Sequence, residues 1–345
     1  MISVGIIGGS GYTGKYLLKF CSAHPFIHSV TLYGKKTAGK SIYSIFPELS
    51  ELMPDMIVTD ASSLSYQHDV YFTALPHGEA LLFVPQLIEA GKTVIDLGGD
   101  YRLENKTEYE KWYHQAHNSA DLLQKKTYGI ADYLHRVAYT ESLIANPGCY
   151  PTATLLGLLP LAEYFSDRII SISTAAYSGS SGAGKSPKAE LLLSEMHGNV
   201  RAYSVNTHRH QPEIEQNLRA YQYKSDYSFT THLLPVAVGI YATSTVFTKE
   251  PVPQETLDFL YKKQYSDSPF VRVRESAPDL NWVVGTNFCD INISANGRTI
   301  VITSAIDNLI KGASGQAIQN LNKYFGWDET LGIIPKGIHC AKIPA

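Results

Sequence analysis

Cysteine is scarce in this chain: of its 345 residues only four are cysteines, at positions 21, 149, 289 and 340. None of them forms a CxxC pair or a metal-binding spacing, so the sequence predicts neither a disulfide framework nor a structural zinc site. A surplus of charge of one sign is also lacking, because 29 basic and 32 acidic residues give a net charge of −3 without long runs. This balance argues against nucleic acid and anionic membranes as partners.

Long apolar runs are missing as well. No segment approaches the roughly 20 apolar residues of a membrane span, and Val4–Ile7 is too short for a signal sequence. We therefore expect no membrane partner and a cytoplasmic location. A chain of this length can bury the cores of two domains without disulfides or metals.

The first 148 residues alternate strand and helix patterns. Short apolar runs predict strands at Ile2–Ile7, Ser29–Tyr33, Val70–Leu75, Thr93–Leu97 and Leu143–Ala145. Helical spacing is found at Lys15–Cys21 and at Glu79–Ala90, where Gly91 follows. Strands that alternate with helices form parallel sheets, so we predict an α/β Rossmann domain with a doubly wound parallel sheet over residues 1–148.

After residue 148 the pattern changes to several apolar runs with few helical segments between them. Strands are predicted at Ile169–Thr174, Phe229–Leu234, Val236–Phe247, Phe270–Val273, Phe288–Ile293 and Thr299–Ile306. This pattern predicts a C-terminal α+β domain with a mostly antiparallel sheet over residues 149–306, which would serve catalysis and oligomerisation. Helical spacing returns at Asp307–Phe325, so we expect residues 307–330 to pack back on the first domain and residues 331–345 to form a tail.

A glycine-rich loop, Gly8–Gly14, lies between the first predicted strand and the first predicted helix. Gly8, Gly11 and Gly14 would let the backbone approach a pyrophosphate at a helix N-terminus, where N–H groups point at the anion. A tight turn without a ligand is the alternative. The position directly between strand and helix favours a dinucleotide-binding loop.

The segment after the second predicted strand bears on the choice between NAD and NADP. NAD enzymes tend to carry an acidic residue there, which binds the ribose hydroxyls. This chain instead has Lys35 and Lys36, and the first acid comes only at Glu48. Two lysines suit a 2′-phosphate, so we predict NADP as the cofactor. The alternative is a solvated surface turn.

Cys149 lies in Asn146–Thr152, between the strand pattern Leu143–Ala145 and a helical pattern over Thr152–Phe165. Pro151 suits a first helical turn, where no N–H is needed. At a helix N-terminus the positive end of the dipole stabilises a thiolate, which makes the sulfur a nucleophile. A buried structural cysteine is the alternative. The Pro-Gly before the cysteine and the proline after it favour a constrained turn that presents the side chain.

Two histidines flank an arginine at His208, Arg209 and His210, just before a predicted helix over Pro212–Tyr221. An imidazole can exchange a proton near neutral pH, so either histidine could deprotonate a thiol. We favour His208 slightly, because His210 is nearer the helix and could cap it or bind phosphate. Arg209 is a candidate substrate-binding residue. No third ligand has a suitable spacing, so we predict no metal site.

A glycine-serine loop, Ser178–Lys185, follows the strand pattern Ile169–Thr174. The spacing of its glycines does not match the phosphate loop of nucleotide hydrolases, so we reject that reading. We expect Ser178 and Gly179 to approach the substrate or the nicotinamide. A mobile loop without a ligand is the alternative.

Arg102 lies just past the strand pattern Thr93–Leu97, at the sheet edge where ligands of parallel sheets bind. It is a candidate for binding the substrate. The alternative is an ordinary surface ion pair with Glu104 or Asp100.

Taken together, five segments closely resemble the N-acetyl-γ-glutamyl-phosphate reductase family: Gly8–Gly14, Asn146–Thr152, Ser178–Gly184, His208–Ile214 and Asp307–Ala313. The resemblance runs from the first strand to Trp327. The wider semialdehyde dehydrogenase group, which includes the aspartate enzyme, shares the architecture but differs in these segments. Relatives often carry Ser-Arg after the second strand, whereas Gly34-Lys35-Lys36 keeps the positive charge without arginine's planar fork.

The resemblance implies reduction of N-acetylglutamyl 5-phosphate by NADPH to the semialdehyde, with release of phosphate, in arginine biosynthesis. It implies Cys149 as the nucleophile, His208 or His210 as its proton partner and Arg102 as a residue that holds the leaving phosphate. It also implies a set of residues that line the cofactor: Ser10, Gly11, Tyr12, Thr13 and Asn308. The acyl phosphate would form a thioester, which hydride can reduce, in a cleft between the two domains.

Two alternatives stay open. The first is another semialdehyde dehydrogenase that reduces an acyl phosphate, with an aspartate or a different N-acylglutamate substrate. The second is a catalytically silent NADP-binding sensor, which would need the glycine loop but neither a nucleophilic Cys149 nor paired histidines. In every case we expect a small-molecule ligand and a homo-oligomer, either a dimer or a tetramer.

Overall fold

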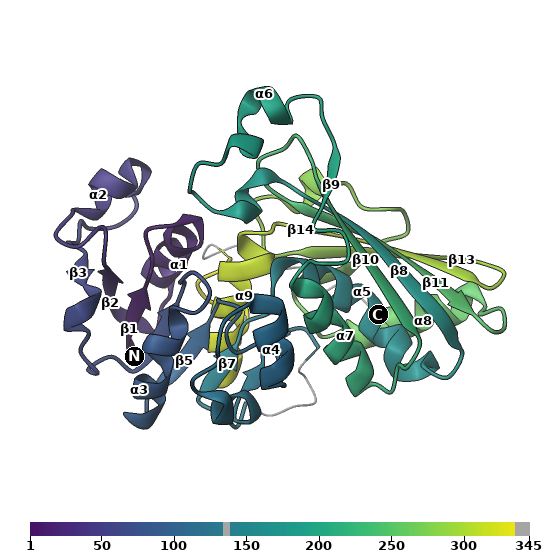
Figure 1. Cartoon of the computed structure of the whole chain (residues 1–345), viewed down its shortest axis with the longest axis horizontal. Coiled ribbons are helices and arrows are strands. Elements are labelled where there is room, and N and C mark those ends of the chain that lie inside the picture. Colours follow the sequence, from purple (N-terminus) through teal and green to yellow (C-terminus); the bar gives the residue numbers. More distant parts are fainter. Residues whose placement is uncertain (134–138, 335–345) are drawn as a thin grey trace. The chain divides into compact units, whose positions relative to one another are not determined.

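The computed structural model describes residues 1–133 and 139–334, so most of the predicted tail and Cys340 lie outside the described residues. The chain divides into two compact units (Figure 1). Most of the first unit is Met1–Gly148, to which the chain from Ala313 returns, and most of the second is Cys149–Gly312. Within the described ranges, no helix combines the length and the apolar character that crossing a membrane requires.

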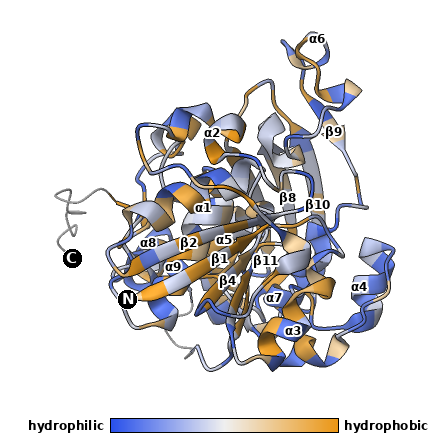
Figure 2. Cartoon of the chain, turned by 90° about the vertical axis from the view of Figure 1, so that its left-hand side faces the viewer, coloured by the Kyte–Doolittle hydropathy of each residue, from blue (hydrophilic) through white to orange (hydrophobic). Residues whose placement is uncertain are grey.

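The first unit is a parallel sheet with the strand order β3-β2-β1-β4-β5-β7-β6. Its strands are β1 (Ile2–Ile7), β2 (Ile27–Gly34), β3 (Thr59–Asp60), β4 (Val70–Thr73), β5 (Thr93–Asp96), β6 (Thr127–Tyr128) and β7 (Leu143–Ala145). Burial is nearly complete in β1, β4, β5 and β7, as expected for a sheet covered on both faces. Figure 2 shows the apolar colour concentrated in strands such as β1 and β4. The predicted doubly wound parallel sheet is confirmed.

Helices cover both faces of this sheet. They are α1 (Tyr12–Ala23), α2 (Ile42–Ile45), α3 (Val84–Glu89), α4 (Lys106–Tyr113) and α9 (Gly315–Tyr324). Contacts join α1 to α9 and to β2, and join α3 to β5. The β1-to-β2 and β4-to-β5 connections run in opposite directions across the sheet, so right-handed crossovers place α1 and α3 on opposite faces.

In the first unit one predicted helix differs from the structure and one helix was not predicted. The helix predicted over Glu79–Ala90 is two pieces, a 3₁₀ turn at Ala80–Leu82 and α3, because Pro85 has no N–H with which to continue a helix from Leu81. Helix α4 was missed, since only Tyr109 of its residues is buried and the apolar periodicity is weak. Its capping signal was present in the sequence: Oδ1 of Asn105 accepts from the N–H groups of Thr107 and Glu108.

The second unit is built on a mixed, mostly antiparallel sheet with the order β12-β13-β14-β11-β8-β10-β9. Its strands are β8 (Ile169–Ser178), β9 (Arg201–Tyr203), β10 (Asp226–Leu233), β11 (Ile240–Thr248), β12 (Val271–Val273), β13 (Cys289–Asn296) and β14 (Thr299–Ile306). The β8–β10 and β12–β13 pairs are parallel and the other pairs are antiparallel. The predicted strand over Val236–Phe247 begins only at Ile240, because residues 236–239 form a turn that ends at Gly239, whose φ is +115°.

Helices lie along one face of this sheet (Figure 1). They are α5 (Cys149–Phe165), α7 (His210–Ala220) and α8 (Gln254–Gln264), and a short α6 (Leu193–Met196) lies in the segment between β8 and β9. Helix α5 is almost entirely buried from Tyr150 to Ala162 and contacts β8, β11, β14 and α7. Sequence reasoning missed α8, although its buried residues Leu257, Leu260 and Tyr261 have helical spacing.

Short turns complete the chain. The 3₁₀ helices are Pro47–Leu49, Ala61–Ser63, Ala80–Leu82, Ala120–Gln124, Ser180–Ala183, Ala189–Leu191 and Leu280–Trp282. A π-helical turn, Ile310–Ser314, precedes α9, so the helix predicted over Asp307–Phe325 is not regular throughout. Its start is fixed by Asp307, whose carboxylate accepts from the N–H groups of Leu309 and Ile310.

Candidate active site

Cys149 is the first residue of α5, which agrees with its expected place at a helix N-terminus. Its side chain is partly exposed, whereas the rest of the first turns of α5 is buried. The thiol therefore stands at the positive end of the dipole of α5. A sulfur at this place can be reached by a substrate and has its thiolate form favoured.

The π-helical turn passes directly against this cysteine. A Cβ atom added to Gly312 would lie 2.7 Å from Cβ of Cys149 and 3.1 Å from its Cα, which no real side chain permits. The N–H of Gly312 donates to the carbonyl oxygen of Asp307 (2.9 Å) and closes the wide turn. Sequence reasoning missed Gly312, although it lies in a motif that carried the resemblance.

The next residue, Tyr150, connects Cys149 to the two histidines. Its ring lies edge-on to His208 (5.3 Å between ring centroids) and to His210 (6.0 Å), and the two imidazoles are 4.8 Å apart. The fold thus brings the predicted nucleophile and both predicted proton carriers into one neighbourhood, from α5 and from the start of α7. Sequence spacing could not establish this, since almost 60 residues separate the segments.

His208 has a defined hydrogen bond and an unusual environment. Its Nδ1 accepts from the backbone N–H of His210 (3.1 Å), so a neutral His208 carries its proton on Nε2. Burial among aromatic rings and, to a smaller extent, the charge of Arg209 together lower its pKa to about 4. The ring is therefore neutral at physiological pH and presents an N–H donor.

His210 is the first residue of α7 and is buried, while Arg209 before it is exposed. His210 does not take the capping position considered for it: Arg209 stands at the N-cap of α7, and the N–H of His210 donates to the side chain of His208. The exposed guanidinium of Arg209 can meet an anionic group of a ligand from solution.

The glycine-serine loop is held by backbone bonds and by Asn308. The N–H groups of Gly179 and Ser181 donate to the carbonyls of Gly239 and Ala237, and a Cβ on Gly179 would lie 2.7 Å from that Ala237 carbonyl. Asn308 is buried; its Oδ1 accepts from the N–H of Gly239 (2.7 Å) and its Nδ2 donates to Oγ of Ser181 (3.0 Å). Asn308 thus ties the two loops together.

Ser178 ends β8 beside this loop. It is buried, its hydroxyl donates to the carbonyl of Gly179 (2.9 Å), and it also interacts with the hydroxyl of Tyr150. Ser178 and Gly179 therefore belong to the same unit and neighbourhood as Tyr150.

In the first unit, the glycine loop has the geometry that a pyrophosphate needs. Gly8 has a φ of +85°, and a Cβ on Gly14 would lie 2.0 Å from the carbonyl oxygen of Gly9. Gly11 occupies the cap of α1, where no side chain blocks the first N–H groups and nothing lies within 4 Å of an added Cβ. This open helix start can receive an anion through its backbone donors.

Lys35 and Lys36 directly follow β2 and are exposed. Nζ of Lys35 lies 5.9 Å from the centre of the Phe83 ring. Both lysines are exposed, so their ammonium groups can contact a phosphate. Ser10, Tyr12 and Thr13 lie in the loop or at the start of α1, as the resemblance requires.

Arg102 is buried, so it is not the surface residue considered as an alternative. Its guanidinium donates from Nε to the carbonyl of Asn146 (2.9 Å) and from Nη2 to that of Leu97 (2.7 Å). The N–H of Asn146 in turn donates to the carbonyl of Asp96. Arg102 therefore fixes the start of the segment that leads to Cys149.

Asp96 beside it is fully buried at the end of β5. Burial and, to a smaller extent, the charge of Asp100 raise its pKa to about 6, against the opposing effects of the Thr73 hydroxyl, the Gly98 N–H and the charge of Arg102. Oδ1 of Asp96 accepts from Thr73 and from the N–H of Gly98. This carboxyl is a residue that sequence reasoning did not single out.

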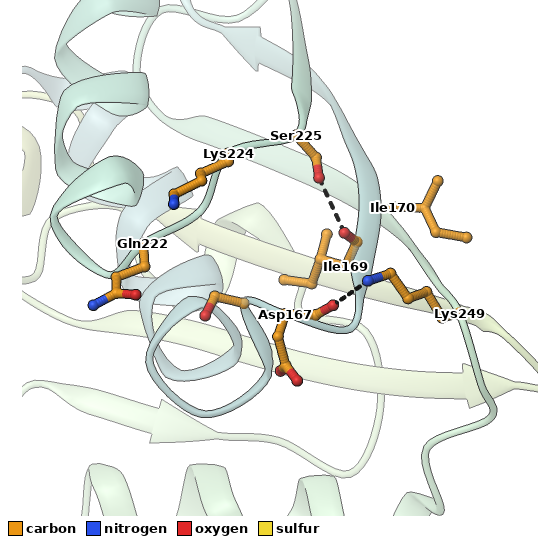
Figure 3. A pocket seen from close by; sticks show the side chains of 8 residues that line it. Asp167, Ile169, Ile170, Gln222, Lys224, Ser225 and Lys249 are labelled. Atoms are coloured by element: carbon orange, nitrogen blue, oxygen red, sulfur yellow. Dashed lines mark hydrogen bonds between the residues drawn. The ribbon is translucent and has the colours of Figure 1, made fainter.

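A hollow of the second unit lies beyond the end of α5 (Figure 3) and has none of the predicted site residues in its wall. It is lined by Ser166, Asp167, Ile169, Ile170, Gln222, Lys224, Ser225 and Lys249. Nζ of Lys249 donates to the carbonyl of Asp167 (2.6 Å) and the hydroxyl of Ser225 to that of Ile169 (3.1 Å). These bonds satisfy carbonyls after the helix end, which is a structural role.

Among the described residues, no three His, Cys, Asp or Glu side chains converge as metal ligands. Sequence reasoning also missed Tyr150, Tyr203 and Phe229, whose rings surround His208. The only signal for them was the high tyrosine content of 23 residues, which does not single out positions.

Comparison with known proteins gives consistent results. The family model described as "Semialdehyde dehydrogenase, NAD binding domain" matches residues 3–139, and "Semialdehyde dehydrogenase, dimerisation domain" matches residues 149–308. Curated proteins named N-acetyl-gamma-glutamyl-phosphate reductase are similar over nearly full length. That of Geobacillus sp. (strain WCH70) is 41% identical over 342 residues, covering 96% of this chain and 98% of its own. That of Pelodictyon phaeoclathratiforme is 42% identical over 340 residues, covering 96% and 99%.

Solved structures share the fold at low identity. Aspartate semialdehyde dehydrogenase II from Vibrio cholerae, complexed with ASA, has a TM-score of 0.72 at 16% identity and covers 94% of this chain and 98% of its own. Aspartate semialdehyde dehydrogenase with NADP from Candida albicans has a TM-score of 0.67 at 16% identity and covers 94% and 99%.

Proposed function

Because the chain belongs to the N-acetyl-γ-glutamyl-phosphate reductase family, we propose that it reduces N-acetylglutamyl 5-phosphate to the 5-semialdehyde with NADPH and releases phosphate, as a step of arginine biosynthesis. The observation that carries this proposal is the partly exposed thiol of Cys149 at the start of α5, next to Tyr150 and the two histidines that Tyr150 contacts. We assign residues 1–148 to cofactor binding, 149–306 to catalysis and oligomerisation, and 307–330 to the return to the first unit.

The first chemical step is acyl transfer to sulfur. The thiolate of Cys149 attacks the carbonyl carbon of the acyl phosphate, a C–S bond forms, and the C–O bond to phosphorus breaks as phosphate leaves with the electron pair. The cofactor, when bound, supplies a hydride to the thioester carbon. The electron pair of the resulting oxyanion then re-forms the C=O bond as the C–S bond breaks, which frees the aldehyde and restores the thiolate.

The hydrogen bonds support different roles for the two histidines. His208 is neutral and carries its proton on Nε2, since Nδ1 already accepts from the N–H of His210. It is suited to donate to the developing oxyanion, together with the backbone N–H of Cys149 at the helix start. His210 is then the better candidate for taking the thiol proton, which reverses the slight preference for His208.

The first unit fits NADP by the shape of its loop and by its charge. The close approach of Gly14 to Gly9 and the uncapped start of α1 suit a pyrophosphate, lined by Ser10, Gly11, Tyr12 and Thr13. Lys35 and Lys36 after β2 suit a 2′-phosphate. In the second unit, Asn308 acts by holding the loop that carries Ser181.

The residues proposed for substrate binding offer hydrogen-bonding groups or positive charge. Ser178, Gly179 and the exposed Arg209 are candidates for the acetamide and the carboxylate of the substrate. Arg102 is proposed for the leaving phosphate, while its bonds to Leu97 and Asn146 hold the guanidinium in place.

The loop Ser178–Gly184 contains no acidic residue, which favours a neutral acetamide over an ammonium group. An ammonium without a carboxylate partner in a closed site would cost several kcal/mol, about a thousandfold or more in rate. Free aspartyl phosphate carries such an ammonium, whereas the acetylated glutamyl compound does not.

The test is a spectrophotometric assay in the reverse direction. The chain is given phosphate and NADP with either N-acetylglutamate semialdehyde or aspartate semialdehyde, and kcat/KM is compared. We expect the acetylated substrate to be preferred by about a thousandfold or more. Equal values, or a preference for aspartate semialdehyde, would leave only the wider semialdehyde dehydrogenase class.

We also propose that the chain works as a homo-oligomer in the cytoplasm, with a dimer as its basic state. The matched family domain over residues 149–308 is described as a dimerisation domain. Cys21 and Cys289 are free and buried thiols, which suits a reducing compartment.

A further inference from the structure

The imidazole of His208 lies in an aromatic box formed by Tyr150, Tyr203 and Phe229. The ring centroids are 5.3, 5.7 and 5.8 Å from that of His208, and the rings stand at 86°, 70° and 79° to it. These edge-to-face contacts come from three elements, α5, β9 and β10, that are distant in the sequence. No part of the reaction as described above uses Tyr203.

Tyr203 is itself held in place by several contacts. Its hydroxyl is 2.9 Å from that of Tyr150, and its carbonyl accepts from Oγ1 of Thr231 (2.6 Å) on the neighbouring strand β10. The hydroxyl of Tyr150 also donates to the carbonyl of His232 (3.4 Å). Burial raises the pKa of Tyr203 to about 12, so the phenol stays protonated and can donate.

The backbone between Tyr203 and His208 is unusual. Ser204 and Asn206 have φ values of +46° and +56°, in the left-handed region that residues with a Cβ seldom adopt. These conformations turn the chain sharply after β9, so that His208 comes back against the ring of Tyr203. Such strain persists where surrounding structure over-determines it, and it is common at functional sites.

We propose that Tyr203 is a positioning residue of the reductase reaction: its ring closes the box around His208, and its hydroxyl, through Tyr150, fixes the box beside Cys149. The box keeps His208 as a neutral Nε2–H donor aimed at the acyl oxygen. This inference rests on the proposed function for the role of His208, and it adds a residue that the mechanism did not require.

The groups that face His208 set the direction of its titration. Tyr150 faces it from α5, Tyr203 from β9 and His210 from α7, and Arg209 adjoins it. The charge of Cys149 acts on the two tyrosines of the box. Burial by the rings disfavours the imidazolium, and Arg209 acts in the same sense. Removal of the Tyr203 ring admits water to one side of His208, so its pKa must rise toward 6.5.

The test compares Tyr203→Ala, which opens the box, with Tyr203→Phe, which keeps the ring and removes the hydroxyl. Tyr66→Ala is the matched control, because Tyr66 is exposed in the first unit and its hydroxyl bonds only Gln86 among the hydrogen bonds described. Ring nitrogens of histidine, labelled with ¹⁵N, report tautomer and pKa by NMR. A His208→Gln variant assigns the His208 signals.

In Tyr203→Ala we expect the pKa of His208 to rise by at least one unit, with the acidic limb of the kcat profile moving by the same amount. In Tyr203→Phe the pKa and the Nε2–H tautomer should stay as in the unmodified chain. Loss of the hydroxyl bond should lower kcat about three- to tenfold and leave KM for the cofactor unchanged. The control should match the unmodified chain in every readout.

An unchanged pKa of His208 in folded Tyr203→Ala would overturn the inference, as would a Tyr203→Phe variant with unaltered kcat. If the alanine variant does not fold, Tyr203→Val retains strand propensity while still removing the ring, and the same comparison applies. The NMR readout does not depend on turnover. An unmodified chain that is inactive on N-acetylglutamate semialdehyde would instead refute the proposed function.

Discussion

Three cysteines of the described chain differ in what surrounds them. Burial raises the pKa of Cys21 to about 12, and Cys289 is fully buried in β13. Cys149 alone of these combines partial exposure with the start of a helix, where the thiolate is favoured. We therefore expect an alkylating reagent to react with Cys149 before the two buried cysteines.

Replacing Cys149 with serine tests the nucleophile. Cys149→Ser should lose several powers of ten in kcat, because an alkoxide is scarce at neutral pH while a thiolate is not. NADPH binding, measured by fluorescence titration, should be unchanged. Labelling with iodoacetamide should modify Cys149 before Cys21 or Cys289. Wild-type turnover in the variant, or labelling that spares Cys149, would exclude this role.

The lysines after β2 make a second prediction at the residue scale. Each charge-assisted bond to a 2′-phosphate contributes on the order of 1.5–3 kcal/mol, so Lys35→Ala with Lys36→Ala should cut selectivity for NADP by a few powers of ten. Kinetics with NAD should hardly change. The exposed pair Lys106→Ala with Lys111→Ala on α4 is the matched control. Equal kcat/KM for NADP and NAD in the unmodified chain would contradict the prediction.

Helix α5 shows how one element can keep a proline in its interior. Pro160 has no N–H, so the carbonyl of Leu156 lacks its helical donor. The hydroxyl of Tyr265 from beside α8 donates to that carbonyl, and Tyr261 of α8 donates to the carbonyl of Gly157 (2.5 Å). Two of the many tyrosines thus have a structural function, which sequence reasoning could not assign.

Tyr265→Phe should destabilise the second unit by about 1–3 kcal/mol, because it leaves the buried carbonyl of Leu156 without a donor. The measurement is the free energy of unfolding in urea. Tyr66→Phe, which removes a hydroxyl bonded to exposed Gln86, should change it by less than about 0.5 kcal/mol. Equal stabilities of the two variants would mean that the carbonyl of Leu156 does not depend on the hydroxyl of Tyr265 for its hydrogen bond.

At the scale of the whole molecule, one face of the second sheet has no helix packed on it. Paired positions across this open sheet face are half-buried and uncharged: Thr230, Ala175, Thr243, Thr303 and Asn292. The alternate positions of β11 are buried against the helices. A sheet face whose centre is uncharged, in a domain of the matched dimerisation type, is suited to contact a second copy, while Asp290 at its edge is neutralised by Arg272 and Arg274.

Thr243→Arg should therefore convert a dimer into monomers, since Thr243 lies on β11 in the middle of the sheet and a buried charge there has no partner. Sedimentation velocity measures the change in mass. Thr107→Arg, on an exposed site of α4 in the first unit, is the control and should leave the mass unaltered. A Thr243→Arg variant with the mass of the unmodified chain would refute the use of this face.

Local patterns in the sequence determined much of this protein. Apolar runs predicted β1, β2, β4, β5 and β7 of the parallel sheet but not the two-residue strands β3 and β6. Gly8–Gly14 predicted the loop before α1, and the prolines around Cys149 predicted a helix start. These predictions succeed because the backbone conformation at a position depends strongly on residues within a few positions along the sequence. Helix α4 and the break at Pro85 were missed, although Asn105 and the proline itself were visible local signals.

The tertiary structure alone decided which distant groups meet. Position 312 requires glycine because a Cβ atom there would lie 2.7 Å from Cβ of Cys149, a residue 163 positions away in the sequence. His208 became a neutral Nε2–H donor because α5, β9 and β10 pack rings around it and the N–H of His210 occupies Nδ1. Burial and hydrogen bonding depend on chain segments brought together by folding, and no local pattern encodes them.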